Sequence, residues 1–284
     1  MRKLIVFCCP ALASSGVWSG AAEAPRPAPE NWVGARAKAV LYTVFGEEET
    51  WIKIHAAEGL EAGGDGPAIR ARILQLVPKV DSLPYRVGVW RVLANTAPSE
   101  ADRAACIAQV EKIFMNPASP DRSQSIETLC KLRCALKGPV LAEVQRVAES
   151  GPERLKPLAL WSMQLSGVPG ALPRLCALLR SPDVTQRVGA GYALRWLGSR
   201  DPAAQRAVAA AAAEPAGTAA YAYLLSAAFT MDAGPGRSAW RPRLLQVIRT
   251  GSADACFEAC QGVMSRVRVD ELPTFERLLD SPEQ

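Results

Sequence analysis

The chain has 284 residues, of which 49% are hydrophobic and 21% are charged, and its formal net charge is +5 at pH 7. This composition allows a sizeable core, whereas the interleaving of basic residues with acids, as in Arg70 and Arg72 near Asp65, does not indicate the dense basic stripe of a nucleic-acid groove. Aromatic residues are sparse and no alternation typical of strands is evident, so the pattern favours helices over sheets.

Residues 1–24 have the layout of a secretory signal peptide. Two basic residues precede an uncharged stretch over 4–18 that is short for a membrane span, and small residues follow. We expect cleavage after Ala22 or, because a proline follows it, less readily after Ala24. An uncleaved anchor and an extra N-terminal helix are the other interpretations. The leader predicts an exported protein, periplasmic or secreted, with a Pro-rich spacer over 25–30 and no later membrane span.

A short phrase recurs along the chain, in which a small or polar residue and a proline precede a helical apolar pattern. Its prolines are Pro84, Pro120, Pro152 and Pro182, at spacings of 36, 32 and 30 residues, and Trp51 opens a similar segment 33 residues before the first of them. A period near 33 residues is too long for one helix and suits a pair of helices with their turns. The sequence therefore predicts a repeated helix pair.

The phrase has the chemistry of a helix start. Serine accepts a hydrogen bond at an N-cap, proline fits the first helical position, and an acid in the first turn meets the positive end of the helix dipole. All three features occur in Ser181-Pro182-Asp183 and in Ser119-Pro120-Asp121. We therefore predict that the serines cap these helices.

The five segments that follow can be aligned with one another, and apolar residues then fall into shared columns. Apolar columns three residues apart share one helix face and are expected to face the core, with largely polar, solvent-facing columns beside them. The column with the most uniform apolar character contains Leu60, Leu93, Leu129, Trp161 and Leu194. A polar column contains Glu58, Arg91, Glu127, Ala159 and Tyr192.

Another helix is predicted before each of these, which gives about seven pairs. After Trp196 the pattern is weaker, although 219–231 and 253–263 fit as second helices, and an Ala-rich helix is expected over 203–213. The predicted first helices include 69–77, 105–114, 140–148, 170–180 and 243–248.

The segment 172–198 resembles a HEAT repeat of the armadillo-like superfamily and is similar to the short HEAT-like repeats of the phycobilisome-lyase type. Residues 51–58 resemble the second helix of the same unit, and the likeness covers about 31–279. It implies an all-α fold, a right-handed α-solenoid over 31–284, but says little of function because such folds host many binding roles. The fourth repeat departs from the pattern, with Pro157 inside the helix and Trp161 where leucine is usual.

Six cysteines follow the leader, and two pairs of them are four residues apart on predicted helices. A disulfide within one helical turn is strained, whereas a bridge from Cys106 to Cys130 or Cys134 is feasible in an oxidising compartment. The alternative is that the cysteines are small core residues. With a single histidine and no Cys-x-x-Cys motif, no metal site is expected.

The sequence contains no nucleotide-binding, zinc-protease or nucleophile-elbow motif. His55 lies three residues before Glu58, so the two could act as an oriented acid and base. We favour a polar pair in a groove, because no nucleophile accompanies it. Gly63 to Gly66 is interpreted as a turn after a helix, and the basic stretch 237–243 as a solvated loop, with a phosphate or acidic-partner site as the alternative.

The resemblance implies that the second helix of each pair lines a concave face. This lining has mixed charge and includes Tyr and Trp, which suits a protein or peptide partner better than a polyanion. The predicted partner-binding residues are Trp51, His55, Glu58, Arg91, Gln124, Glu127, Lys156, Tyr192 and Trp196, and Lys131 and Gln186 lie on the same lining.

We therefore expect a non-catalytic binding or scaffold protein without a cofactor, whose partner is another protein or peptide. A carbohydrate-associated exported factor, with Trp51, Tyr192 or Trp196 stacked on sugars, is one alternative. A lyase-like helper in cofactor attachment is the other. The last predicted helix, 269–279, lacks a partner helix, which allows self-association through its open face.

Overall fold

The computed structural model describes residues 32–213, 219–232, 234 and 236–279. Within these ranges the chain forms fifteen α-helices and no strand. The all-helical class is therefore confirmed. The predicted leader and spacer, residues 1–30, lie outside the described residues.

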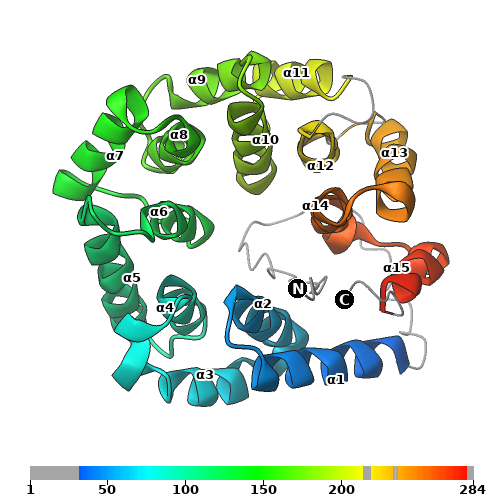
Figure 1. Cartoon of the computed structure of the whole chain (residues 1–284). Coiled ribbons are helices and arrows are strands. Elements are labelled where there is room, and N and C mark those ends of the chain that lie inside the picture. The colour runs from blue at the N-terminus through cyan, green and yellow to red at the C-terminus, as the bar shows by residue number, and fades with distance from the viewer. Residues whose placement is uncertain (1–31, 214–218, 233, 235, 280–284) are drawn as a thin grey trace.

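The helices lie in two layers that curve around a common centre (Figure 1). Along the chain, each inner helix follows an outer one, and each inner helix contacts the next inner helix. The outer helices are α1 (Trp32–Glu47), α3 (Gly66–Leu74), α5 (Glu100–Met115), α7 (Gly138–Ser150), α9 (Ala171–Ala177), α11 (Pro202–Ala211), α13 (Arg237–Thr250) and α15 (Leu272–Leu279). The inner helices are α2 (Trp51–Leu60), α4 (Arg86–Asn95), α6 (Arg122–Lys131), α8 (Lys156–Leu165), α10 (Val184–Leu197), α12 (Tyr221–Met231) and α14 (Ala253–Val263).

Short helical turns extend or join several of these helices. A π-type turn over Glu61–Asp65 connects α2 to α3, and Gly64 adopts a left-handed φ of 96° within it, as the predicted glycine turn requires. The 3-10 turns are Val77–Ser82, Glu153–Leu155, Leu178–Arg180, Met264–Arg266 and Val269–Glu271.

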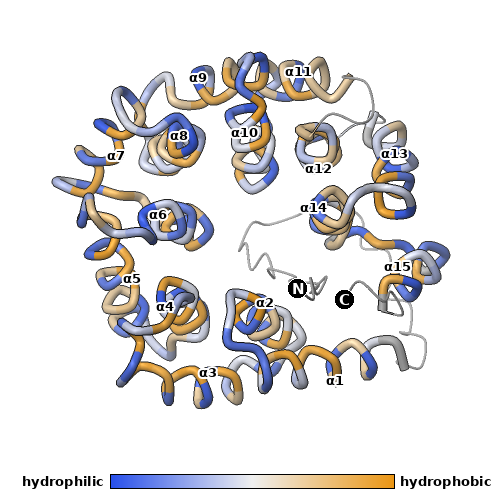
Figure 2. Tube along the Cα trace, viewed as in Figure 1, coloured by the Kyte–Doolittle hydropathy of each residue, from blue (hydrophilic) through white to orange (hydrophobic). Residues whose placement is uncertain are grey.

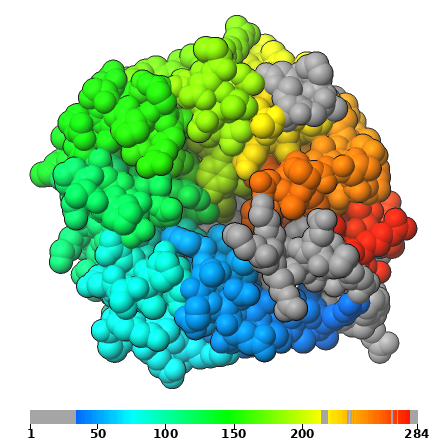
Figure 3. Space-filling model, viewed as in Figure 1, coloured from blue at the N-terminus to red at the C-terminus, as the bar shows by residue number. Residues whose placement is uncertain are grey.

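The core lies between the two layers, and side chains fill the space between the ribbons (Figure 3). The column from Leu60 to Leu194 is buried throughout, with no member more than 1% exposed. Burying a leucine contributes about 2 kcal/mol, so this column alone is a large favourable term. Apolar residues recur in both layers (Figure 2). None of the helices in the described ranges is long and apolar enough to cross a bilayer.

The helix starts differ from the predicted ones by two residues. The Oγ atoms of Ser119 and Ser181 accept bonds from the N–H groups of Asp121 and Asp183, at 3.3 and 3.1 Å, and the helices begin one residue after those acids. Asp183 caps α10 by accepting from the Thr185 N–H at 2.8 Å. The predicted serine caps are wrong because a serine can bond the N–H two residues on and form a turn.

Two proline positions also differ from expectation. Pro157 lies in the first turn of α8, which begins at Lys156, because proline has no N–H to lose there. The basic stretch from Arg237 to Arg243 is helical, not a loop, and contains Pro242 within α13. Leu244 and Ile248 of the same helix are buried, and this packing favours the helix despite the proline.

Glycines allow the inner helices to approach closely. A Cβ atom on Gly189 of α10 would lie 2.8 Å from the Pro157 ring of α8, and one on Gly191 would lie 3.1 Å from the backbone of Tyr223 in α12. These positions tolerate no side chain unless the neighbouring helix moves, so small residues determine the spacing of α8, α10 and α12.

Candidate functional site

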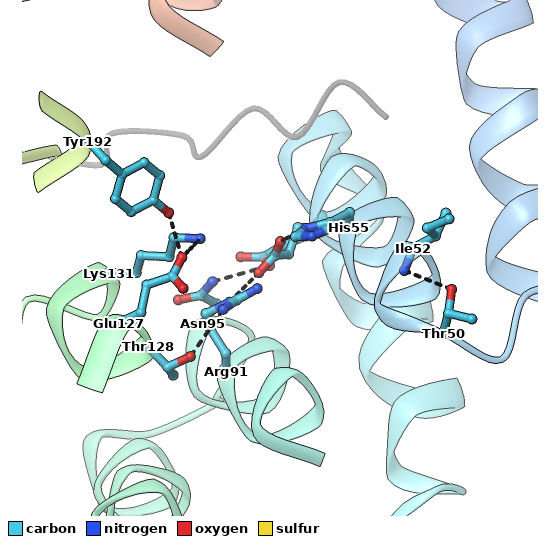
Figure 4. Close-up of polar contacts among 11 residues, drawn as sticks. Thr50, Ile52, His55, Arg91, Asn95, Glu127, Thr128, Lys131 and Tyr192 are labelled. Atoms are coloured by element: carbon cyan, nitrogen blue, oxygen red, sulfur yellow. Dashed lines mark hydrogen bonds and ion pairs between the residues drawn. The ribbon is translucent and has the colours of Figure 1, made fainter. Parts of the chain in front are cut away.

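A buried arginine joins the first three inner helices. The side chain of Arg91 on α4 is 3% exposed; its Nε donates to Glu58 Oε1 of α2, and its Nη1 donates to Thr128 Oγ1 of α6 at 3.0 Å (Figure 4). The sequence placed Arg91 on a solvent-facing column, and its burial corrects that expectation. A guanidinium this deep must be paired, because an isolated buried charge is strongly unfavourable.

His55 and Trp51 extend this cluster along α2. His55 Nδ1 lies 3.2 Å from Glu58 Oε2, so both carboxylate oxygens of Glu58 are in contact with a nitrogen. The Trp51 ring lies 6.4 Å from the His55 ring and 5.7 Å from the Arg91 guanidinium carbon. His55 and Glu58 are therefore in contact, and Arg91 contacts the same carboxylate.

A second carboxylate connects α6 to α10. Glu127 Oε1 accepts from Lys131 Nζ at 2.7 Å and from the Tyr192 hydroxyl (Figure 4). Because Tyr192 lies 65 residues further along the chain, this contact passes over α8. The pair thus ties together helices that are not sequential inner neighbours.

The Tyr192 ring packs with two tryptophan rings, those of Trp161 and Trp196. Trp161 lies edge-on to Tyr192 at 6.1 Å and stacks on Trp196 at 6.3 Å with an interplanar angle of 25°. Lys131 Nζ lies 5.2 Å from the Trp196 ring centre, and the Arg195 guanidinium lies 5.3 Å from that of Tyr192. Cation–π attraction of this kind contributes about 0.5–2 kcal/mol where the groups are desolvated.

Arg195 carries the network onward to the last inner helix. Its Nε and Nη2 donate to the two carboxylate oxygens of Glu258 on α14, at 2.7 and 3.3 Å, and the two side chains are only 8% and 2% exposed. The Ser226 hydroxyl of α12 donates to the Glu258 backbone carbonyl at 3.0 Å. We call the whole set the inner polar cluster; it comprises Trp51, His55, Glu58, Arg91, Glu127, Thr128, Lys131, Trp161, Tyr192, Arg195, Trp196, Ser226 and Glu258.

Two of the three carboxylates of the cluster, Glu58 and Glu127, are held ionised by their cationic neighbours. Burial alone would raise the pKa of Glu58 and of Glu127, but at Glu58 the combined effect of Arg91, His55 and Lys131 outweighs burial and holds that pKa well below its usual range. Lys131 and Arg91 together lower the pKa of Glu127 to about 2. At Glu258, burial raises the pKa and Arg195 opposes the rise. Glu58 and Glu127 therefore act as fixed charges at neutral pH.

Glu61 differs from the other carboxylates near the cluster. Burial and the negative charge of Glu58 raise its pKa to about 7, and its Oε2 accepts a long bond of 3.5 Å from the Asn95 amide. This is the group beside the cluster whose charge changes near neutral pH.

The structure brings together most of the predicted site residues. Trp51, His55, Glu58, Arg91, Glu127, Tyr192 and Trp196, with Lys131, belong to the inner polar cluster. Lys156 and Gln186 instead both contact Glu153, at the start of α8 and α10, and the Gln124 side chain accepts a bond from Ser123. The contacts of these three residues lie outside the cluster and mark a separate region of the same helices.

Sequence reasoning missed Arg195, Glu258, Thr128 and Trp161 as members of the cluster. Glu258 could have been found by continuing the polar column of Glu58 and Arg91 into α14, but the repeat is weak there. Thr128 and Arg195 are adjacent in sequence to predicted residues, and helical phase assigned them to other faces. Trp161 was assigned to the core, where it is indeed buried, and it also contacts Tyr192.

The six cysteines of the described residues carry free thiols. Cys106, Cys130, Cys256 and Cys260 are buried, and burial raises the pKa of Cys134 and of Cys176 to about 11. This matches the interpretation as small core residues. Among the described residues no group of His, Cys, Asp and Glu could hold a metal ion.

A separate hollow of about 830 Å³ lies between α12, α13 and α14, with Val188 of α10 on its wall. Its lining is mainly apolar and includes Tyr221, Tyr223 and Arg243. Arg243 Nε already donates to the Tyr221 hydroxyl at 2.9 Å and its Nη2 donates to the Ala212 carbonyl at 3.0 Å. Because these donors are used within the protein, the inner polar cluster is the stronger candidate site.

Comparisons with protein families, with curated proteins and with solved structures found no match to this chain.

Proposed function

We propose that this chain is a non-catalytic binding or scaffold protein that uses the inner face of its helices to hold another protein or peptide. The proposal includes the fold, a right-handed α-solenoid of about seven HEAT-like helix pairs with the inner helices on the concave side. The contact of each inner helix with the next supports it. We further propose, from the signal-peptide layout of residues 1–24, that the protein is exported and acts in the periplasm or outside the cell.

The observation that carries the proposal is the convergence of charged and aromatic side chains from α2, α4, α6, α8, α10 and α14 in one network. Buried ion pairs rarely stabilise a protein more than apolar packing would. A cluster of three ion pairs is therefore better explained by a role in binding than by stability. Arg, Tyr and Trp are also the residues that most often dominate binding energy at protein interfaces.

The carboxylates favour binding over catalysis. A general acid or base works best when its pKa lies near the working pH, whereas the pKa of Glu58 and of Glu127 lies far below neutrality. The raised pKa of Glu61 favours acid–base chemistry more than the lowered ones do, but the side-chain contact of Glu61 is with the Asn95 amide, which is not a nucleophile.

The aromatic rings argue against the carbohydrate alternative. Sugar stacking needs an open ring face, but Lys131 lies over both Tyr192 and Trp196, and Trp161 stacks on Trp196. Self-association through α15 also loses support, since Phe275 on that helix is only 7% exposed in the chain by itself. We retain a heterologous protein or peptide as the partner.

The test is capture of the tagged full-length chain from its source organism. Wild-type protein should co-elute with one partner in fixed stoichiometry, and the double variant Trp51→Ala, His55→Ala should lose it. A Gln109→Ala, Lys112→Ala double variant, changed at exposed positions of the outer helix α5, is the matched control. Unchanged helical circular dichroism must accompany the loss. Equal recovery by the cluster variant, or a bound glycan or chromophore in place of a protein, would contradict the proposal.

A further inference from the structure

We infer that the partner segment is acidic and places a carboxylate against Arg91, with Trp196 donating to a second acceptor of the same segment. The inference rests on the proposed function and adds the chemistry of the occupant.

The first argument is that the cluster retains buried donors. Arg91 Nη2 and Trp196 Nε1 are buried and have no hydrogen-bond partner among the described residues, and Trp161 Nε1 shares this property. Leaving a buried polar group unbonded is unfavourable, because its hydrogen bonds to water are lost without replacement. All three atoms are N–H donors, so the group that would satisfy them is an acceptor.

The second argument is that each carboxylate of the cluster is already paired with a cation of the chain. Both oxygens of Glu58 contact a nitrogen, both oxygens of Glu258 accept from Arg195, and Glu127 Oε1 accepts two bonds. A basic side chain of a partner would therefore have to displace an existing ion pair to find a carboxylate.

The third argument concerns the aromatic faces, where a partner lysine or arginine would otherwise stack. Lys131 and Arg195 lie 5.2 Å from the Trp196 ring centre, and Arg91 lies 5.7 Å from that of Trp51. These rings already hold cations of the protein itself. An additional cation would meet their positive charges, whereas a carboxylate would be attracted to them.

Exposure defines how the segment would enter. The side chains of His55 and Glu127 are 32% and 27% exposed, whereas that of Arg91 is 3% exposed. His55 and Glu127 are therefore more open to solvent than the guanidinium that they lie beside (Figure 4). Side chains that are open to solvent change rotamer readily on binding, and the planar guanidinium suits a carboxylate better than a point charge would.

The test is selection from a random twelve-residue peptide library displayed on phage, with the purified full chain as bait. Selected peptides should share a glutamate or aspartate at one aligned position. In titration calorimetry, replacing that residue by glutamine or asparagine should weaken binding at least tenfold.

Two protein variants locate the contact. Arg91→Lys keeps the charge but removes Nη2. It should weaken binding of the acidic peptide at least tenfold and leave unchanged the binding of the amide peptide, in which glutamine or asparagine replaces the acid. Trp196→Phe removes one N–H and keeps an aromatic ring, so it still tests the contact if the arginine variant misfolds. Its affinity for the acidic peptide should fall about threefold to tenfold. Trp240→Phe, outside the cluster, should bind as wild type.

The outcomes separate the two proposals. Enrichment of peptides without an acidic consensus, or equal affinity for acidic and amide peptides, overturns the acidic partner and leaves the binding role intact. Failure of any peptide to be enriched, together with failure of host capture, overturns the binding role itself.

Discussion

Two buried arginine–glutamate pairs in this molecule differ in how completely they are satisfied. Arg241 on α13 donates from Nη1 to both oxygens of Glu271, at 2.7 and 2.6 Å, and from Nη2 to the Arg266 carbonyl at 2.7 Å. Arg91 has comparable burial, but its Nη2 has no partner among the described residues. Burial of charge alone is therefore not a sign of function; unused hydrogen-bonding capacity at a buried charge is the more specific sign.

The largest expected effect breaks the satisfied pair. Arg241→Ala leaves Glu271 buried at 7% exposure without its guanidinium, which should reduce the free energy of unfolding by about 3–5 kcal/mol. Urea denaturation followed by circular dichroism measures this. A change below about 1 kcal/mol would show that the Arg241–Glu271 pair behaves as a solvent-screened surface pair, and it would invalidate the comparison with Arg91 and Glu58.

Lysine substitutions at the two arginines sharpen the comparison. Arg241→Lys should cost about 1–3 kcal/mol because one ammonium cannot reach both Glu271 and the Arg266 carbonyl. Arg91→Lys should cost less, since it loses the Thr128 bond but also removes an unbonded donor. Denaturation of both variants under identical conditions gives the ranking, and the reverse order would contradict our view of Arg91.

The pH dependence of stability at Glu61 tests the electrostatics beside the Arg91–Glu58 pair. Its pKa of about 7 in the folded protein exceeds the ordinary value of 4.5, so the folded state holds the proton more tightly and stability falls as pH rises from about 4.5 to 7. Glu61→Gln mimics the protonated acid. The free energy of unfolding of this variant, relative to that of wild type, should therefore be about 1–2 kcal/mol greater at pH 8 than at pH 4. Glu100→Gln, at an exposed position, is the control. A constant difference between variant and wild type across this range would exclude the effect.

The smallest effect concerns the bond between α6 and α10. Tyr192→Phe removes the hydroxyl that donates to Glu127 and should cost about 1 kcal/mol, because Lys131 still pairs with that carboxylate. Thermal unfolding is sensitive enough to detect it. Tyr221→Phe, which loses the bond from Arg243, provides a comparison outside the inner polar cluster.

The fold class and the main helices could be predicted from the sequence because the apolar column from Leu60 to Leu194 repeats at helical spacing. The α14 helix matches its predicted range of 253–263, whereas α13 begins at Arg237, before the predicted 243. Local pattern cannot decide between serine as cap and serine as turn, which is why the starts after Ser119 and Ser181 shifted.

The candidate site could be predicted only in part. Helical phase identifies the inner face on which Glu58, Arg91 and Tyr192 lie, but it does not give the distance between inner helices. That distance depends on close contacts such as the one between Gly189 and Pro157, and it determines whether a polar column is solvated or buried. The Arg195–Glu258 pair joins residues 63 positions apart and leaves no local trace in the sequence.

The bonds that pass over one inner helix have a consequence for folding. In a linear array each unit depends only on its immediate neighbours, so the ends can melt while the middle persists. Here Tyr192 reaches past α8 to Glu127, and Arg195 reaches past α12 to Glu258. Such long-range ties should make the chain melt as a single cooperative unit and fold more slowly than an array of the same length with sequential contacts alone.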